Sequence, residues 1–162
     1  MTRNEQVIWA AGFLDGESYI GLSRGLSKST GRPFHQAIID AAQIRRAPLD
    51  VLANLFGGNV REGTRAYYWR VSGRHTQTAL RETLPYFVMK RRQAELVLEF
   101  CDTMSGKQGK RLSDVLLAER ELMWAELRVL NQINVYGQAE RLSERAPKGA
   151  VLTAARNLRM VR

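Results

Sequence analysis

The chain has 162 residues, of which 44% are hydrophobic and 25% charged, an ordinary globular composition with room for one core. Lysine and arginine number 25 against 16 acids, which gives a formal net charge of +9. Such an excess fits a polyanionic partner, a nucleic acid or an anionic membrane surface. No apolar run approaches the ~20 residues needed to cross a bilayer. A single cysteine, Cys101, excludes an internal disulfide and a cysteine-based zinc site, and its apolar neighbours predict a buried thiol.

The N-terminal residues MTRNEQVIW lack the pattern of a signal peptide, which predicts an intracellular protein. Arginine, alanine and glycine are abundant, as is typical of proteins from GC-rich genomes. This favours a bacterial cytoplasm or nucleoid over an organelle matrix.

The first part of the chain predicts a helix followed by two strands. Residues 5–15 have helical spacing, with Asn4 as the N-cap and Gly16 as the stop. Alternation of apolar and polar side chains predicts a strand over 18–24, and turn residues lead into a returning strand over 34–44.

The next segments predict a helix over 47–56, closed by Gly57-Gly58, and a second hairpin. The strands of this hairpin are 59–62 and 66–72. The remaining elements are three helices and a tail: 75–87, 90–104, 112–137 and 138–162. We expect one domain over 1–137, followed by a basic C-terminal tail or docking helix over 138–162.

This order of elements predicts an α+β fold, in which four antiparallel strands have helices on one side. An antiparallel sheet of this kind can present its other face to water or to a ligand. Alternation places Tyr68 and Arg70 on that open face, while Trp69 points to the core.

Two acids, Asp15 and Glu17, stand at the end of the first predicted helix. A helix C-terminus carries partial negative charge, so a carboxylate there is disfavoured by roughly 0.3–1 kcal/mol. The position of these acids therefore indicates a specific partner for them.

The stretch AAGFLDGES, residues 10–18, resembles the signature of the LAGLIDADG homing endonucleases, in the branch that has one motif per chain and acts as a homodimer. QIRRAPLDVL (43–52) and LPYFVMKRRQAELVL (84–98) are similar to further segments of that family. The family fold has the same αββαββα order. The resemblance covers about residues 5 to 130 and implies a nuclease of intron homing.

The resemblance also implies an active site for Mg²⁺- or Mn²⁺-dependent DNA cleavage, which Ca²⁺ can occupy without supporting cleavage. Glu17 takes the place of the metal-binding carboxylate, joined by the Gly16 carbonyl. Lys90 aligns with the family's active-site lysine, and Arg45 with a basic residue near the scissile phosphate. A water-ordering glutamine of the family falls on Ala41 here, so Asp40 or Gln43 is expected to substitute for it.

The partners implied are double-stranded DNA and a second copy of the chain, with no membrane. The motif helices of two copies would pack together, because Gly12 and Gly16 form a small-xxx-small pair. The expected dimer interface comprises Trp9, Gly12, Phe13, Asp15 and Gly16. The sheet would lie in the major groove of a long pseudo-palindromic target, with these candidate contacts: Ser23, Arg32, Gln36, Asn59, Arg61, Tyr68 and Arg70.

Two alternatives use the same fold. The first is an RNA maturase, whose partner would be the host intron RNA. The second is a DNA-binding regulator that does not cleave.

Overall fold

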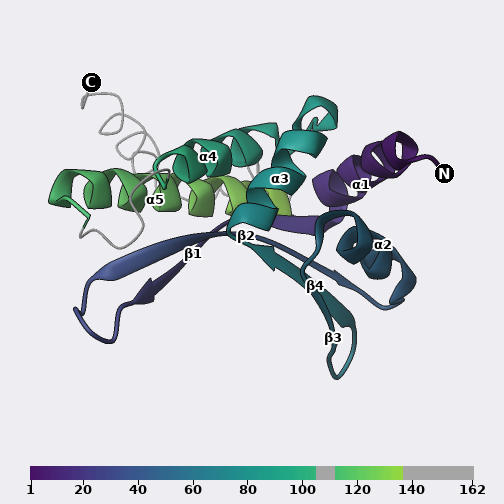
Figure 1. Ribbon diagram of the computed structural model, residues 1–162, viewed down its shortest axis with the longest axis horizontal. Helices are drawn as coiled ribbons and strands as arrows, with labels where there is room; N and C mark the ends of the chain where they lie inside the picture. Colours follow the sequence, from purple (N-terminus) through teal and green to yellow (C-terminus); the bar gives the residue numbers. More distant parts are fainter. Residues whose placement is uncertain (105–111, 137–162) are drawn as a thin grey trace. The chain divides into compact units, whose positions relative to one another are not determined.

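The computed structural model of the chain describes residues 1–104 and 112–136. Its elements follow one another in this order (Figure 1): α1 (Arg3–Glu17), β1 (Ser18–Leu26), β2 (Pro33–Gln43), α2 (Ala47–Phe56), β3 (Asn59–Glu62), β4 (Tyr67–Ser72), α3 (Arg74–Thr83), the 3-10 turn η1 (Leu84–Tyr86), α4 (Arg91–Asp102) and α5 (Asp114–Tyr136). The predicted αββαββα order and α+β class are confirmed.

Contacts along the chain group Met1–Asn131 into one unit, and a second unit begins at Gln132. The first unit contains the sheet and the helices that pack on it. The predicted tail, 138–162, lies outside the described residues.

The four strands form one antiparallel sheet in the order β1-β2-β4-β3. Helices cover one face of this sheet and leave the other uncovered (Figure 1). Cross-strand pairing aligns Tyr19, Asp40, Arg70 and Asn59 in a single row across all four strands. Side chains in this row lie on the open face, as the period-two alternation of each strand predicts.

The core lies between the sheet and the helices. Trp69 of β4 is fully buried there, and its indole Nε1 donates a hydrogen bond of 2.9 Å to the Gly57 carbonyl. Gly57 and Gly58 both have positive φ and end α2, as predicted. Gly58 could not be replaced cheaply, because an added Cβ would lie 2.5 Å from the Arg70 carbonyl oxygen.

The first helix begins and ends differently from the prediction. Thr2, not Asn4, is the N-cap, because its hydroxyl accepts from the Glu5 N–H while the Glu5 carboxylate accepts from the Thr2 N–H. The helix also continues through Gly16 to Glu17. Ser18 caps it, with its N–H and hydroxyl both donating to the Leu14 carbonyl, so β1 follows without a loop.

The later helices are shorter than predicted. α3 ends at Thr83 instead of 87, because Pro85 supplies no N–H and its ring obstructs a helical continuation. Cys101 is buried on α4 as expected, and burial raises the pKa of its thiol to about 11. Within 1–104 and 112–136, no helix is both long and apolar enough to pass through a membrane.

Candidate functional site

The carboxylate of Asp15 is held inside the protein and does not face a ligand. It accepts hydrogen bonds from the backbone N–H groups of Val88, Met89 and Lys90, at 3.0, 3.0 and 2.7 Å. Burial by itself would raise the pKa of Asp15. The three backbone hydrogen bonds and the charge of Lys90 outweigh that effect and lower the pKa below its ordinary value. Asp15 thus ties the end of α1 to the segment before α4.

The Lys90 side chain is buried against the same end of α1. Its ammonium donates to the carbonyls of Leu14, at 3.2 Å, and Gly16, at 3.1 Å. Burial lowers the pKa of Lys90, and the charges of Asp15 and Glu17 partly oppose this shift. The ammonium therefore offsets the negative end of the helix, which explains how α1 tolerates two acids there.

Replacing Asp15 with asparagine should lower the free energy of unfolding by about 1–3 kcal/mol at neutral pH, because the amide cannot serve all three N–H groups and has no charge to pair with Lys90. The difference in unfolding free energy between wild type and Asp15→Asn should shrink as the pH falls. Since the folded-state pKa lies below 3.8, the carboxylate's stabilisation is complete above the unfolded-state pKa and is lost as the pH falls through the folded-state pKa.

Urea unfolding of both proteins, from neutral pH to about pH 2, measures this difference. Asp102→Asn is the matched control, because its carboxylate forms an exposed pair with Arg81 and the change should cost less than about 1 kcal/mol. A gap that stays constant throughout the acid range would contradict the role given to Asp15.

Glu17, the last residue of α1, has an exposed carboxylate at the edge of the open sheet face. Its Oε2 accepts a hydrogen bond of 3.3 Å from the Gln43 amide at the end of β2. The structure therefore brings Gln43, and not Asp40, into contact with Glu17. Ala41 is buried on the core side of β2.

The Glu17 carboxylate and the Gly16 carbonyl fit a divalent cation whose other ligands come from water and a substrate, and not one coordinated by protein groups alone. Within residues 1–104 and 112–136, no three acidic, histidine or cysteine side chains gather as a metal-binding group. Mg²⁺ commonly takes one or two carboxylates and completes its shell with water and substrate phosphates. Glu17 supplies the carboxylate. The Gly16 carbonyl already accepts from Lys90, so only its second lone pair is available.

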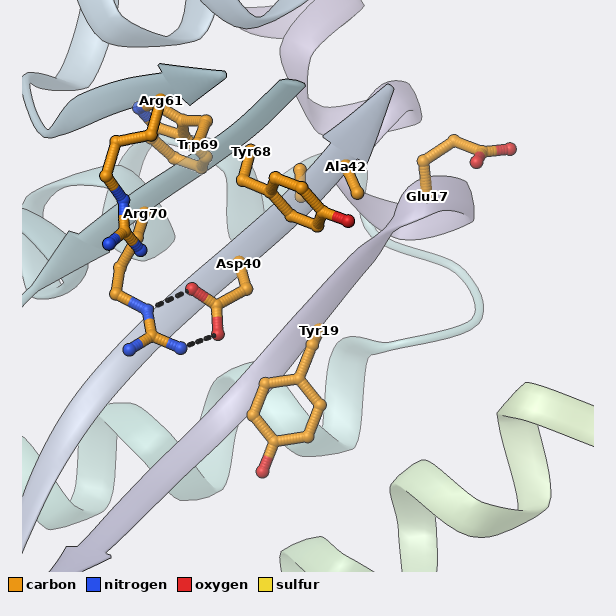
Figure 2. A pocket seen from close by; sticks show the side chains of 9 residues that line it. Glu17, Tyr19, Asp40, Ala42, Arg61, Tyr68, Trp69 and Arg70 are labelled. Atoms are coloured by element: carbon orange, nitrogen blue, oxygen red, sulfur yellow. Dashed lines mark hydrogen bonds and ion pairs between the residues drawn. The ribbon is translucent and has the colours of Figure 1, made fainter. Parts of the chain in front are cut away.

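A hollow of about 320 Å³ on the open face extends from Glu17 to β3 (Figure 2). Across it, Arg70 donates to Asp40 through Nε, at 2.5 Å, and through Nη2, at 2.6 Å. These hydrogen bonds raise the pKa of Arg70. Both carboxylate oxygens of Asp40 thus accept from Arg70, whereas Gln43 donates to Glu17. The hollow is lined by Glu17, Tyr19, Asp40, Ala41, Ala42, Arg61, Tyr68, Trp69 and Arg70.

Most of the predicted DNA contacts share the open face. The alternation of β1 to β4 places these residues there: Ser23, Gln36, Asn59, Arg61, Tyr68 and Arg70. Arg32 is different, since its guanidinium donates to the Leu112 carbonyl and pairs with Asp114 at the start of α5. Arg45, in the bend after β2, is exposed. The roles of all these residues stay predictions.

The side of α1 that carries Ile8, Trp9 and Phe13 is apolar and partly exposed, although Trp9 and Phe13 also pack against the core. Trp9 and Phe13 stack with ring centroids 5.3 Å apart, and Ile8 is 44% exposed. A Cβ added at Gly12 or Gly16 would meet nothing within 4 Å. Four of the five predicted interface residues line this side or flank it, whereas Asp15 faces the interior.

Tyr19 was missing from the predicted site. Its ring lies over Gly21, where an added Cβ would come within 2.6 Å of the hydroxyl, and it lines the hollow. Alternation along β1 could have found it, because Tyr19 has the same facing as Ser23.

No protein-family model matches the chain. No curated protein matches it either. Solved structures do. The homing endonuclease I-CvuI in complex with a DNA target has a TM-score of 0.70 at 23% identity, over 79% of this chain and 83% of that one.

Two further structures are similar. The archaeal intron-encoded homing endonuclease I-Vdi141I, complexed with DNA, has a TM-score of 0.67 at 17% identity over 78% of this chain and 84% of its own. The I-SmaMI LAGLIDADG homing endonuclease, bound to cleaved DNA, has a TM-score of 0.61 at 16% identity over 74% of this chain and 42% of its own. The αββαββα unit described above therefore has the fold of the LAGLIDADG homing endonucleases.

Proposed function

We propose that this protein is a site-specific DNA endonuclease that works as a homodimer and needs a divalent metal ion. It makes a staggered double-strand break in a long pseudo-palindromic target. The observation that carries the proposal is the exposed carboxylate of Glu17, placed where α1 reaches the edge of an open, arginine-bearing sheet face. The similar proteins I-CvuI and I-Vdi141I, both determined with DNA, support a duplex as the partner.

The homodimer is supported by the open side of α1. Two α1 helices can approach closely only where small residues face each other, and Gly12 and Gly16 leave that space free. The chain also matches 42% of the longer I-SmaMI chain, which leaves room there for a second unit of this size. A C₂ dimer would bring two copies of Glu17 to one axis and read a target with mirrored halves.

The reaction is phosphodiester hydrolysis. A bound Mg²⁺ or Mn²⁺ would stabilise charge on the attacking and leaving oxygens. Two I-CvuI structures were determined in the presence of Mg, with the DNA not cleaved, and of Ca, which supports a divalent cation but does not choose among metals. Glu17 would hold the cation, and the Gln43 amide, which donates to the Glu17 carboxylate, would orient it. Lys90 keeps the end of α1 electrostatically balanced. Arg45, exposed in the bend after β2, would approach a phosphate of the duplex.

A selection for bound sequences from a randomised duplex library, followed by cleavage of a plasmid carrying the selected site, tests this function. We expect a pseudo-palindromic consensus and a double-strand break in Mg²⁺ but not in EDTA. Tight, selective binding without nicking or cleavage would contradict the nuclease and favour the regulator. Preferential binding of structured RNA would favour the maturase.

Duplex binding should also weaken steeply with salt. A protein that neutralises Z phosphates has a log–log slope of about −0.9Z, so a dimer using roughly eight phosphate contacts should show a slope of about −7. Fluorescence anisotropy with the selected duplex at several salt concentrations measures this slope. A value near zero would show that the +9 charge is not used on DNA.

A further inference from the structure

The pair formed by Asp40 and Arg70 occupies the middle of the open face. The two residues are direct partners in the β2–β4 ladder, and their row continues to Tyr19 on one side and Asn59 on the other. The side chains are 29% and 52% exposed. An ion pair this accessible adds little to folding stability, so its position on the face calls for another explanation.

The hydrogen bonds of the pair leave one edge of the guanidinium free. Arg70 donates its Nε–H and one Nη2–H to the two carboxylate oxygens of Asp40. Three of the five N–H groups remain, two on Nη1 and one on Nη2. Among the residues that the structure describes, Asp40 is the only hydrogen-bond partner of this side chain. Figure 2 shows the remaining nitrogen directed away from the carboxylate.

Two adjacent N–H groups match the O6 and N7 acceptors of guanine in the major groove. A free arginine must lose rotamer freedom to present them, whereas an arginine held by a carboxylate has already lost much of it. Rows on one face of a sheet are ~6.6–6.8 Å apart, against ~3.4 Å between base pairs, so one row faces about two base pairs. Arg70 is the one arginine among the four residues of its row, so its free edge can contact a guanine in one of these two base pairs.

Resting on the function proposed above, we propose that Asp40 fixes Arg70 so that its free edge reads guanine. Each half of the target then requires a G·C pair at one position. Asp40 acts here as a positioning residue, and Arg70 makes the contact with the base.

Arg61 provides a matched comparison. It lies in the next row, opposite Tyr68, and lines the same hollow. Arg61→Ala and Arg70→Ala each remove one positive charge from the same face. Only Arg70→Ala removes the arginine that is hydrogen-bonded to Asp40. Asp40→Ala and Asp40→Asn keep Arg70 and its charge while weakening the support.

The test is selection from a randomised duplex library with the full chain in Ca²⁺, followed by affinity measurements on the selected duplex and its single-base variants. Wild type should fix one guanine per half-site. Arg70→Ala should lose that preference by roughly 5- to 150-fold, at that position only. Both Asp40 variants should weaken the same preference. Arg61→Ala should lower the overall affinity, because Arg61 is a candidate DNA contact, but should not change the preference for this guanine.

The outcomes separate the inference from the function on which it rests. If wild type selects no duplex sequence, the proposed function is contradicted. If wild type selects a consensus, but Arg70→Ala keeps the preference for every guanine in it, the inference is contradicted and the endonuclease proposal is not. If Arg70→Ala relaxes a guanine but neither Asp40 variant does, Asp40 has no positioning role. Thermal unfolding shows whether each variant is folded before it is compared.

Discussion

Glu17→Gln is expected to abolish DNA cleavage and to leave affinity for the selected duplex within a few-fold of wild type. The substitution keeps the size of the side chain and its hydrogen bond to Gln43, but removes the charge that would hold a cation. Metal stabilisation of a transition state is worth several kcal/mol, so the rate should fall on the order of a thousandfold or more. Single-turnover cleavage in Mg²⁺ and anisotropy in Ca²⁺ measure the two effects separately.

Glu62→Gln is the matched control for this change. Glu62 is an exposed acid of β3 whose facing is opposite to that of Arg61, so its loss alters net charge equally without touching the site. Its cleavage rate should stay near that of wild type. A Glu17→Gln protein that cleaves within a few-fold of wild type would remove Glu17 from the active site.

Gly12→Val is expected to abolish cleavage through assembly and not through chemistry. Within one chain, a Cβ added at Gly12 would meet no atom within 4 Å, so we expect the fold of the monomer to survive the substitution. In a dimer that packs α1 against its copy, the valines would overfill the seam, where overpacking costs ~1–3 kcal/mol at each site. Analytical ultracentrifugation should show a monomer with wild-type helical content by circular dichroism, and the monomer should not cleave.

Gly12→Ala separates this explanation from a general effect on the helix. Alanine favours a helix interior over glycine by about 1 kcal/mol and occupies far less space than valine. The alanine variant should therefore be at least as stable as wild type and should remain a dimer. A Gly12→Val protein that is an active dimer would show that α1 is not the interface.

The end of α1 shows how two neighbouring acids acquire different tasks. Asp15 is enclosed, and its charge is satisfied by three N–H groups and an ammonium. Glu17, two residues later, is exposed at the edge of the open sheet face and accepts one hydrogen bond, from Gln43. Of two acids in one short stretch, Asp15 therefore connects α1 to the segment before α4, and Glu17 offers an exposed carboxylate for a ligand.

Local patterns in the sequence were enough to predict the element order and the facing of the strands. β3 was predicted at its observed bounds, and Trp69 and Arg70 fall on the faces that alternation assigns. Such features depend on neighbours two to four residues away, and a period of two or 3.6 records them directly. The ends of α1 were less predictable. Both Thr2 and Asn4 can cap a helix, and Thr2 is the residue that does so. At the other end, the Lys90 ammonium donates to the Gly16 carbonyl, and the helix continues to Glu17.

What only the tertiary structure decided is which partner each charged side chain takes. Lys90 donates its backbone N–H to Asp15 across 75 residues of sequence, Arg70 pairs with Asp40 across 30, and Arg32 with Asp114 across 82. A sequence shows that these charges exist but not which of them meet, because a pair depends on how whole elements pack. Packing pairs Arg32 with Asp114 and Asp40 with Arg70, and it places Gln43, the other candidate for ordering water, in hydrogen-bond contact with Glu17.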